Sequence, residues 1–168
     1  EAHAHGSGDT TYLINVGITL SQMGRYDKAA QIFEQIQKEA PRFGAPYRNL
    51  IVVYDLLGEP KKAWEWGEKG LEFLNLDGAE YSRLSLSMIQ LAYLHGWDDQ
   101  SRAQADKILK QFPNTYWYSD VAGLLTGRLT SEEFTQKVRS QYQGLDSTIP
   151  IYVLISYVLQ KKWDDLSA

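Results

Sequence analysis

Short units of nearly constant length follow one another along the chain, and this periodicity limits the folds open to it. The glycine at Gly24 is followed by Gly58 after 34 positions. Gly96 then follows after 38 positions, Gly127 after 31 and Lys161, at the equivalent place, after 34. A repeat of this length indicates an array of similar helical units, each too small to bury its own apolar face.

Two further markers recur in step with the turn glycines. An alanine lies five positions after each of the first two glycines, at Ala29 and Ala63. A residue type that ends helices lies 17 positions after three of the glycines, at Pro41, Pro113 and Gly144. The markers predict that each unit is a helix, a tight turn at the glycine and a second helix.

The apolar pattern predicts an all-α chain. Apolar residues recur at spacings of three and four, and alternating strand patterns are absent. We expect first helices near 10–23, 44–57, 79–95, 115–126 and 148–161. We expect second helices near 26–40, 60–74, 98–112 and 131–143.

Length and charge exclude several classes of protein. The 168 residues are enough for one domain with a core, and we expect a leader or expression remnant at 1–9 and one helical repeat domain at 10–168. The net charge of −4 argues against nucleic-acid binding, which needs a basic face. No stretch reaches the roughly 20 apolar residues of a membrane span. The chain has no cysteine, so it forms no disulfide.

The first unit resembles a tetratricopeptide repeat. The resemblance is carried by Leu13, Val16, Gly17, Leu20, Gly24, Tyr26, Ala29, Phe33 and Pro41, and in the second unit by Tyr47, Leu50, Tyr54, Gly58 and Ala63. It covers roughly 10–166. It implies a right-handed α-solenoid of antiparallel helix pairs, with about four to five repeats. The second unit departs from the pattern at Gly67 and Gly70, where larger residues are usual.

The small residues predict where helices approach closely. Gly17 and Ala29 are expected to let the two helices of the first unit meet, with Phe33 buried against the next unit. Gly67 and Gly70 lie three apart on one helix face and are each unfavourable in a helix interior. We therefore expect the helix near 79–95 to cross closely over them.

Residues that suggest chemistry have structural interpretations. The pairs Asp98-Asp99, Glu132-Glu133 and Asp164-Asp165 lie at expected helix starts, where acids complement the helix dipole. His3 and His5 suit a Cu(II) or Ni(II) site only if Glu1 is the natural terminus. We therefore predict no catalytic residue, no metal and no cofactor.

The resemblance also implies a concave binding groove lined by the first helices. Its expected residues are Asn15, Ile18, Gln22, Arg48, Asn49, Val52, Asp55 and Tyr93, with Ile14 beside them. Asn15 and Asn49 lie 34 apart, so both occupy one repeat position. Each either bonds a peptide backbone or bonds its own helix. Some family members hold a terminal carboxylate with two basic and two Asn residues, but only Asn49 and, in one frame, Arg83 match that set, so we expect a more apolar groove.

Two functions are open at this point. The first is a non-catalytic scaffold that binds a peptide or protein in the groove. The alternative is an assembly subunit that acts through its C-terminal end, where the expected helix 148–161 is apolar nearly all round. For the alternative we expect self-association, including a homodimer, through residues 149–163. Its central residues are Ile151, Ile155, Val158 and Trp163.

Overall fold

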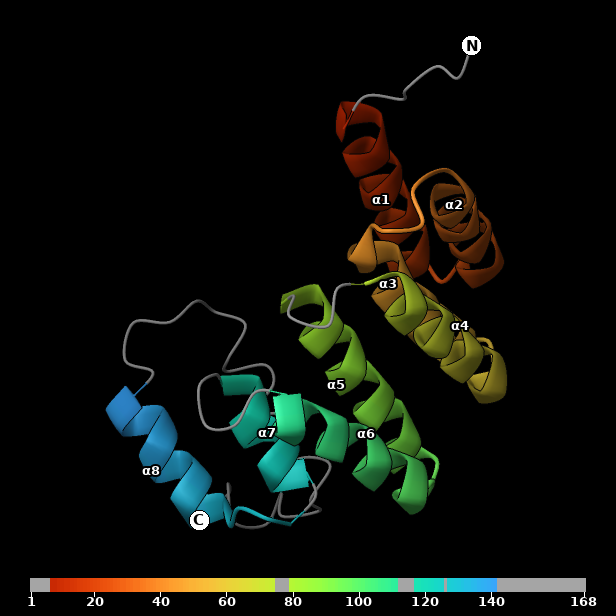
Figure 1. Ribbon diagram of the computed structural model, residues 1–168. Helices are drawn as coiled ribbons and strands as arrows, with labels where there is room; N and C mark the ends of the chain where they lie inside the picture. The colour runs from red at the N-terminus through yellow and green to blue at the C-terminus, as the bar shows by residue number, and fades with distance from the viewer. Residues whose placement is uncertain (1–6, 75–78, 112–116, 126, 142–168) are drawn as a thin grey trace. The chain divides into compact units, whose positions relative to one another are not determined.

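The computed structural model describes residues 7–74, 79–111, 117–125 and 127–141, and these residues are helical with short connections (Figure 1). The described helices are α1 (Ser7–Gln22), α2 (Tyr26–Glu39), α3 (Gly44–Leu56), α4 (Pro60–Phe73), α5 (Ala79–Leu94), α6 (Asp98–Gln111), α7 (Trp117–Leu125) and α8 (Ser131–Gln141). The all-α prediction is confirmed for them. α1 begins three residues earlier than expected. The expected helix 148–161 lies outside the described residues.

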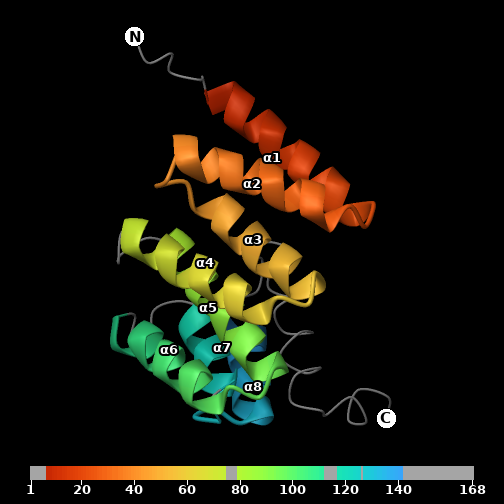
Figure 2. The same ribbon diagram turned by 90° about the vertical axis from the view of Figure 1, so that its right-hand side faces the viewer.

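The chain divides into two compact units, Glu1–Ser87 and Met88–Ala168, and the division falls within α5. In the first unit α1 packs on α2, α2 on α3 and α3 on α4, so successive helices stack in chain order (Figure 2). α1 also contacts α3 directly. In the second unit α6 packs on α7 and α7 on α8. Both units are therefore built from neighbours in sequence, as an array of repeats requires.

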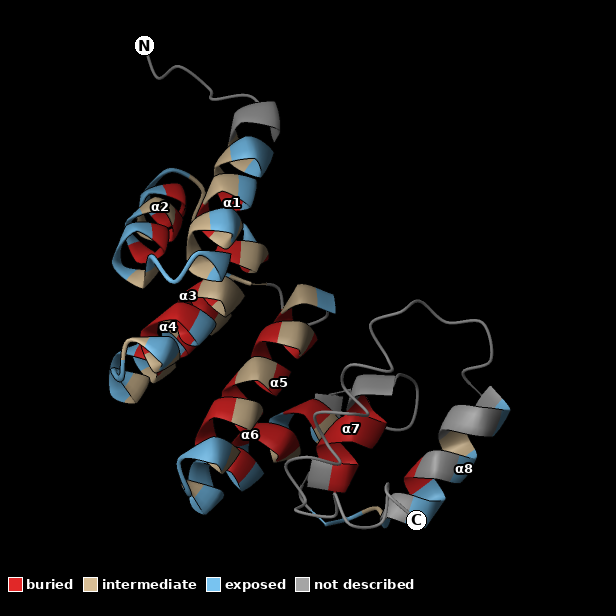
Figure 3. Ribbon diagram, turned by 180° about the vertical axis from the view of Figure 1, so that it is seen from behind, coloured by how far each residue is buried: buried red, intermediate tan, exposed pale blue. Residues whose placement is uncertain are grey.

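The four turn glycines adopt one conformation. Their φ angles lie between +71° and +77°, in the left-handed region where a side chain is strained. In each turn the glycine N–H donates to the carbonyl three residues earlier, and the next N–H donates to the carbonyl five residues earlier. This is the Schellman arrangement that closes a helix C-terminus. The prediction of turns at Gly24, Gly58, Gly96 and Gly127 is confirmed, and all four glycines are exposed (Figure 3).

The core of the first compact unit lies between consecutive helices. Phe33 and Tyr47 are its largest fully buried side chains, and each has a relative exposure of 0%. Ala29, predicted to allow close approach, and the marker alanine Ala63 are also fully buried. Two side-chain hydrogen bonds hold the connection between α2 and α3. Tyr47 Oη donates to the Pro41 carbonyl at 3.0 Å, and Gln37 Nε2 donates to the Phe43 carbonyl at 2.8 Å. These bonds fix where α3 begins.

Candidate functional site: a pocket between the first two repeat units

A small pocket lies where α1 and α3 meet above α2, within the first unit. It has a volume of about 80 Å³. Its lining consists of Ile18, Ser21 and Gln22 of α1, Phe33 of α2, and Asn49, Val52 and Val53 of α3. This space suits a few waters or one small aliphatic side chain.

Gly17 makes room for the Phe33 ring, which lines this pocket. A Cβ at Gly17 would lie 2.5 Å from Cε1 of Phe33, so the Phe33 ring fits only because position 17 has no side chain. The ring is fully buried and is part of the pocket lining. The predicted role of Gly17, a close approach of the first two helices, is therefore confirmed. Phe33 has the predicted position between the first and second repeat units.

The pocket brings together part of the groove expected from the sequence. Ile18, Gln22, Asn49 and Val52 all line it. Asn15 is exposed on α1 and is not part of the lining, although its carbonyl accepts a hydrogen bond from Thr19 Oγ1 at 2.8 Å. The two Asn residues thus share a repeat position, but only Asn49 lies in the pocket.

The other expected groove residues have separate environments. Asp55 of α3 is half-buried and does not line the pocket. Tyr93 is half-buried and belongs to the second compact unit, Met88–Ala168. Ile14, expected beside the groove, is instead a core residue with a relative exposure of 9%. The resemblance placed Ile14 beside the groove, and this is wrong because α1 turns the side chain inward.

Exposed apolar side chains extend from the pocket along α3. Val52 has a relative exposure of 51% and Leu56 of 53%. Residues four apart lie on one face of a helix, so the two side chains form a continuous apolar strip that begins at the pocket. Leu56 was not among the groove residues expected from the sequence. Its signal is an apolar residue two positions before a turn glycine, at a place where the helix end leaves it uncovered.

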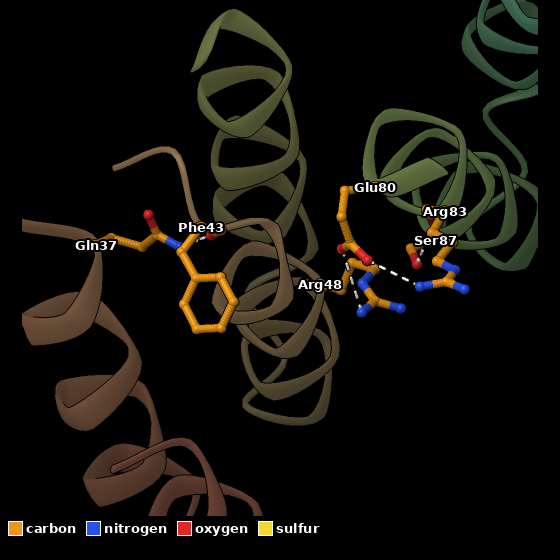
Figure 4. A network of polar contacts seen from close by, with 6 residues as sticks. All are labelled: Gln37, Phe43, Arg48, Glu80, Arg83 and Ser87. Atoms are coloured by element: carbon orange, nitrogen blue, oxygen red, sulfur yellow. Dashed lines mark hydrogen bonds and ion pairs between the residues drawn. The ribbon is translucent and has the colours of Figure 1, made fainter. Parts of the chain in front are cut away.

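A charged cluster links α3 to α5 in the same unit. Arg83 Nη1 donates to Glu80 Oε1 at 2.9 Å, and Arg48 Nη2 lies 3.4 Å from Glu80 Oε2. Figure 4 shows both guanidinium groups directed at this one carboxylate. A Cβ at Gly44 would lie 3.0 Å from Cβ of Glu80, so a glycine at the start of α3 makes room for the acid. Arg48 was predicted for the groove, whereas Glu80 was not among the expected site residues.

The acidic pair Glu132-Glu133 has the structural role predicted for it. Thr130 N–H donates to Glu133 Oε2 at 2.8 Å, and Glu133 N–H donates to Thr130 Oγ1 at 3.2 Å. This reciprocal pair is a capping box at the start of α8. The two hydrogen bonds from Thr130 favour the charged carboxylate and lower the pKa of Glu133. The pair Asp164-Asp165 lies outside the described residues.

The remaining sequence predictions concern metal binding, membrane spans and residues outside the described ranges. Among the described residues, no group of three or more His, Cys, Asp or Glu is arranged to hold a metal ion. Within these same ranges, no helix has both the length and the apolar character to cross a membrane. His3, His5 and the self-association residues Ile151, Ile155, Val158 and Trp163 lie outside the described ranges.

The site therefore offers three kinds of contact for a ligand. The pocket walls are aliphatic at Ile18 and Val52, the Asn49 side chain carries both a donor and an acceptor, and Arg48 adds a cation one residue earlier. Such groups hold a ligand by apolar contact and hydrogen bonding. Searches of protein-family models and of curated proteins give no match for the chain.

Proposed function

We propose that this chain is a tetratricopeptide-like helical-repeat scaffold that binds an extended peptide segment in the groove between α1 and α3. The proposal includes a right-handed solenoid of antiparallel helix pairs. It is supported by four identical Schellman turns at near-constant spacing and by helices packed in consecutive pairs. The role proposed is binding, without catalysis or a cofactor.

One observation carries the proposal. Four of the residues that the family resemblance assigned to the groove, Ile18, Gln22, Asn49 and Val52, line a single pocket. The adjoining strip of Val52 and Leu56 leaves apolar surface exposed, and exposed apolar surface next to polar groups is typical of interaction sites. An extended peptide suits this geometry because a side chain enters the pocket while Asn49 bonds the peptide backbone.

Panning a library of random twelve-residue peptides against the full chain tests this function. We expect enriched peptides whose binding falls when Asn49→Ala or Val52→Asp is introduced, with little change in the thermal melt. Gln31→Ala, an exposed change on α2, serves as the matched control. Asn15→Ala should have the smaller effect of the two Asn changes. Failure to enrich any peptide, or equal binding by all variants, would count against the groove.

A further inference from the structure

A stripe of apolar side chains along α1 stays partly exposed. The members of this α1 stripe recur at spacings of three, four and three, the spacing of an apolar seam between paired helices. They are Leu13, Val16, Leu20 and, in the turn that ends the helix, Met23. The first three are half-buried, and Met23 has a relative exposure of 59% (Figure 3). Ile18 and Gln22, which line the pocket, lie on the opposite side of α1, so the stripe is a separate surface.

The same face of the second repeat unit is covered by a helix. Tyr47, Leu50 and Tyr54 lie 34 positions after the first three stripe residues, and their relative exposures are 0%, 0% and 5%. α2 packs on α3, and Tyr54 Oη donates to Glu34 Oε1 of α2 at 2.5 Å. Because the connection between α2 and α3 is short, the two helices are antiparallel neighbours. The stripe on α1 therefore has the chemistry of a face that a second, antiparallel helix covers.

We propose that the α1 stripe binds the α1 stripe of a second copy of this chain, with the two helices antiparallel. The spacing of the stripe is self-complementary about position 18. Leu13 and Met23 both lie five positions from it, and Val16 and Leu20 both lie two positions from it. A two-fold axis at this point therefore sets Leu13 against Met23 of the second copy and Val16 against Leu20, and each contact occurs twice.

The charge of the surface also favours a second copy. Residues 10–24 include no charged side chain, although the chain as a whole has a net charge of −4. Two copies can therefore approach along α1 without like charges meeting, whereas a charged partner finds no opposite charge on the stripe. The stripe spans about 15 Å of helix, and a contact of this length buries less than the roughly 1,600 Å² of a standard interface. We expect a weak dimer, with a dissociation constant in the micromolar range or above.

Sedimentation velocity of the full chain, from micromolar to millimolar concentration, tests the dimer. We expect a monomer that becomes a dimer as the concentration rises. Met23→Lys should raise the dissociation constant by about tenfold or more, because it sets a charge against Leu13 of the second copy. A cation at a helix C-terminus is favourable, so the thermal melt of the dilute variant should not fall. Gln31→Lys, the same change of charge at an exposed site on α2, is the matched control and should dimerise as the native chain does.

Disulfide cross-linking tests the antiparallel pairing, since the chain has no cysteine of its own. A mixture of the Leu13→Cys and Met23→Cys chains should cross-link on air oxidation. Either variant alone should cross-link far more slowly, because equivalent residues of the two copies lie about 15 Å apart and a disulfide needs Cα atoms within about 7 Å.

Three results would overturn the inference. A native chain that stays monomeric at millimolar concentration has no such dimer, and a melt lowered by Met23→Lys in that monomer would show that another segment of the same chain covers the stripe. A dimer that Met23→Lys leaves unchanged forms through a different surface. Equal cross-linking of the single variants and of their mixture would exclude the antiparallel pairing about position 18.

Discussion

The first and second repeat units fill their interiors with the same kinds of residue placed on opposite helices. Gly17 on α1 faces Phe33 on α2, and the positions 34 residues later are Ile51 on α3 and Gly67 on α4. The small residue and the large residue have exchanged helices. All four residues are buried.

A second pair of equivalent positions also differs in residue size between the two repeat units. Leu13 and Ile36 of the first unit correspond to Tyr47 and Gly70 of the second. A Cβ at Gly70 would lie 2.7 Å from Cγ of Tyr47 and 2.6 Å from Cδ2 of Leu84, so the larger side chains of α3 and α5 occupy the space that Gly70 leaves. The comparison teaches that repeats conserve filled volume between helices more strictly than residue identity, because interiors are close-packed.

The largest expected effect is at the large residue of the first unit. Phe33→Ala should lower the free energy of unfolding by about 3–5 kcal/mol, since it empties a fully buried site. Chemical denaturation of the two proteins measures this. Phe73→Ala, at a side chain with 40% exposure, should cost far less. A loss below about 1 kcal/mol for Phe33→Ala would contradict the stacking of the first two units around this ring.

The small residues should resist enlargement in both units. Gly17→Ala and Gly70→Ala each place a methyl group under 3 Å from a neighbour, and overpacking of this kind costs about 1–3 kcal/mol. The better helix propensity of Ala recovers about 0.5–1 kcal/mol of that. Adding Phe33→Leu to Gly17→Ala should restore part of the stability, whereas adding it to Gly70→Ala should not. An equal change in stability when Phe33→Leu is added to Gly17→Ala and to Gly70→Ala would contradict the specific pairing of Gly17 with Phe33.

Tyr47, which covers Gly70, should make the stability of the second repeat unit sensitive to alkali. Burial, and to a smaller degree the charge of Glu72, raise the pKa of Tyr47 from 10.0 to about 12. The folded chain therefore keeps its phenol proton where the unfolded chain loses it. The stability from Tyr47 is complete below pH 10 and falls as the pH rises toward 12.

Tyr47→Phe removes this titration and the hydrogen bond to the Pro41 carbonyl. The variant should be less stable than the native chain at neutral pH, by about 0.5–1.5 kcal/mol, and should lose less stability between pH 10 and pH 12. Thermal melts across that range give the comparison. Tyr12→Phe is the control, because Tyr12 has a relative exposure of 68%. Parallel pH curves for native and Tyr47→Phe chains would exclude the buried phenol as the cause.

The smallest effect is expected at the turn before α8, which departs from the earlier turns. α2 and α4 begin without a side-chain cap, at Arg25 and Glu59, directly after their turn glycines. α8 begins after Thr130, three residues beyond Gly127, and uses the capping box with Glu133. The pKa of Glu133 is lowered, so its contribution is present above its unfolded pKa near 4.5 and is lost as the pH falls through the folded value.

Glu133→Gln keeps a residue that can complete the box but removes the titration. Its melting temperature should fall less than that of the native chain as the pH drops below 4.5. Glu132→Gln, at the exposed neighbour, should follow the native curve. The reverse order would show that the bonds with Thr130 do not distinguish Glu133 from its neighbour.

The sequence by itself was sufficient for the local architecture. Turn glycines, helix stops and apolar spacing are short-range signals, because a left-handed turn and a helix end depend on residues close in the chain. They located the turns at Gly24, Gly58, Gly96 and Gly127 and the close contacts at Gly17 and Gly70. The family resemblance also named four of the pocket residues, Ile18, Gln22, Asn49 and Val52.

Only the tertiary structure decided which of these residues meet. Ile14 lies beside Asn15 in the chain, yet α1 buries the first and exposes the second. Glu80 lies three residues before Arg83 on α5, a spacing that the sequence shows, whereas its approach to Arg48 of α3 follows only from helix packing. Side-chain meetings of this kind depend on the packing of helices distant in the chain. The packing depends in turn on which of two facing helices carries the small residue and which carries the large one. These residues lie far apart in the sequence, and they fill the space between the helices together.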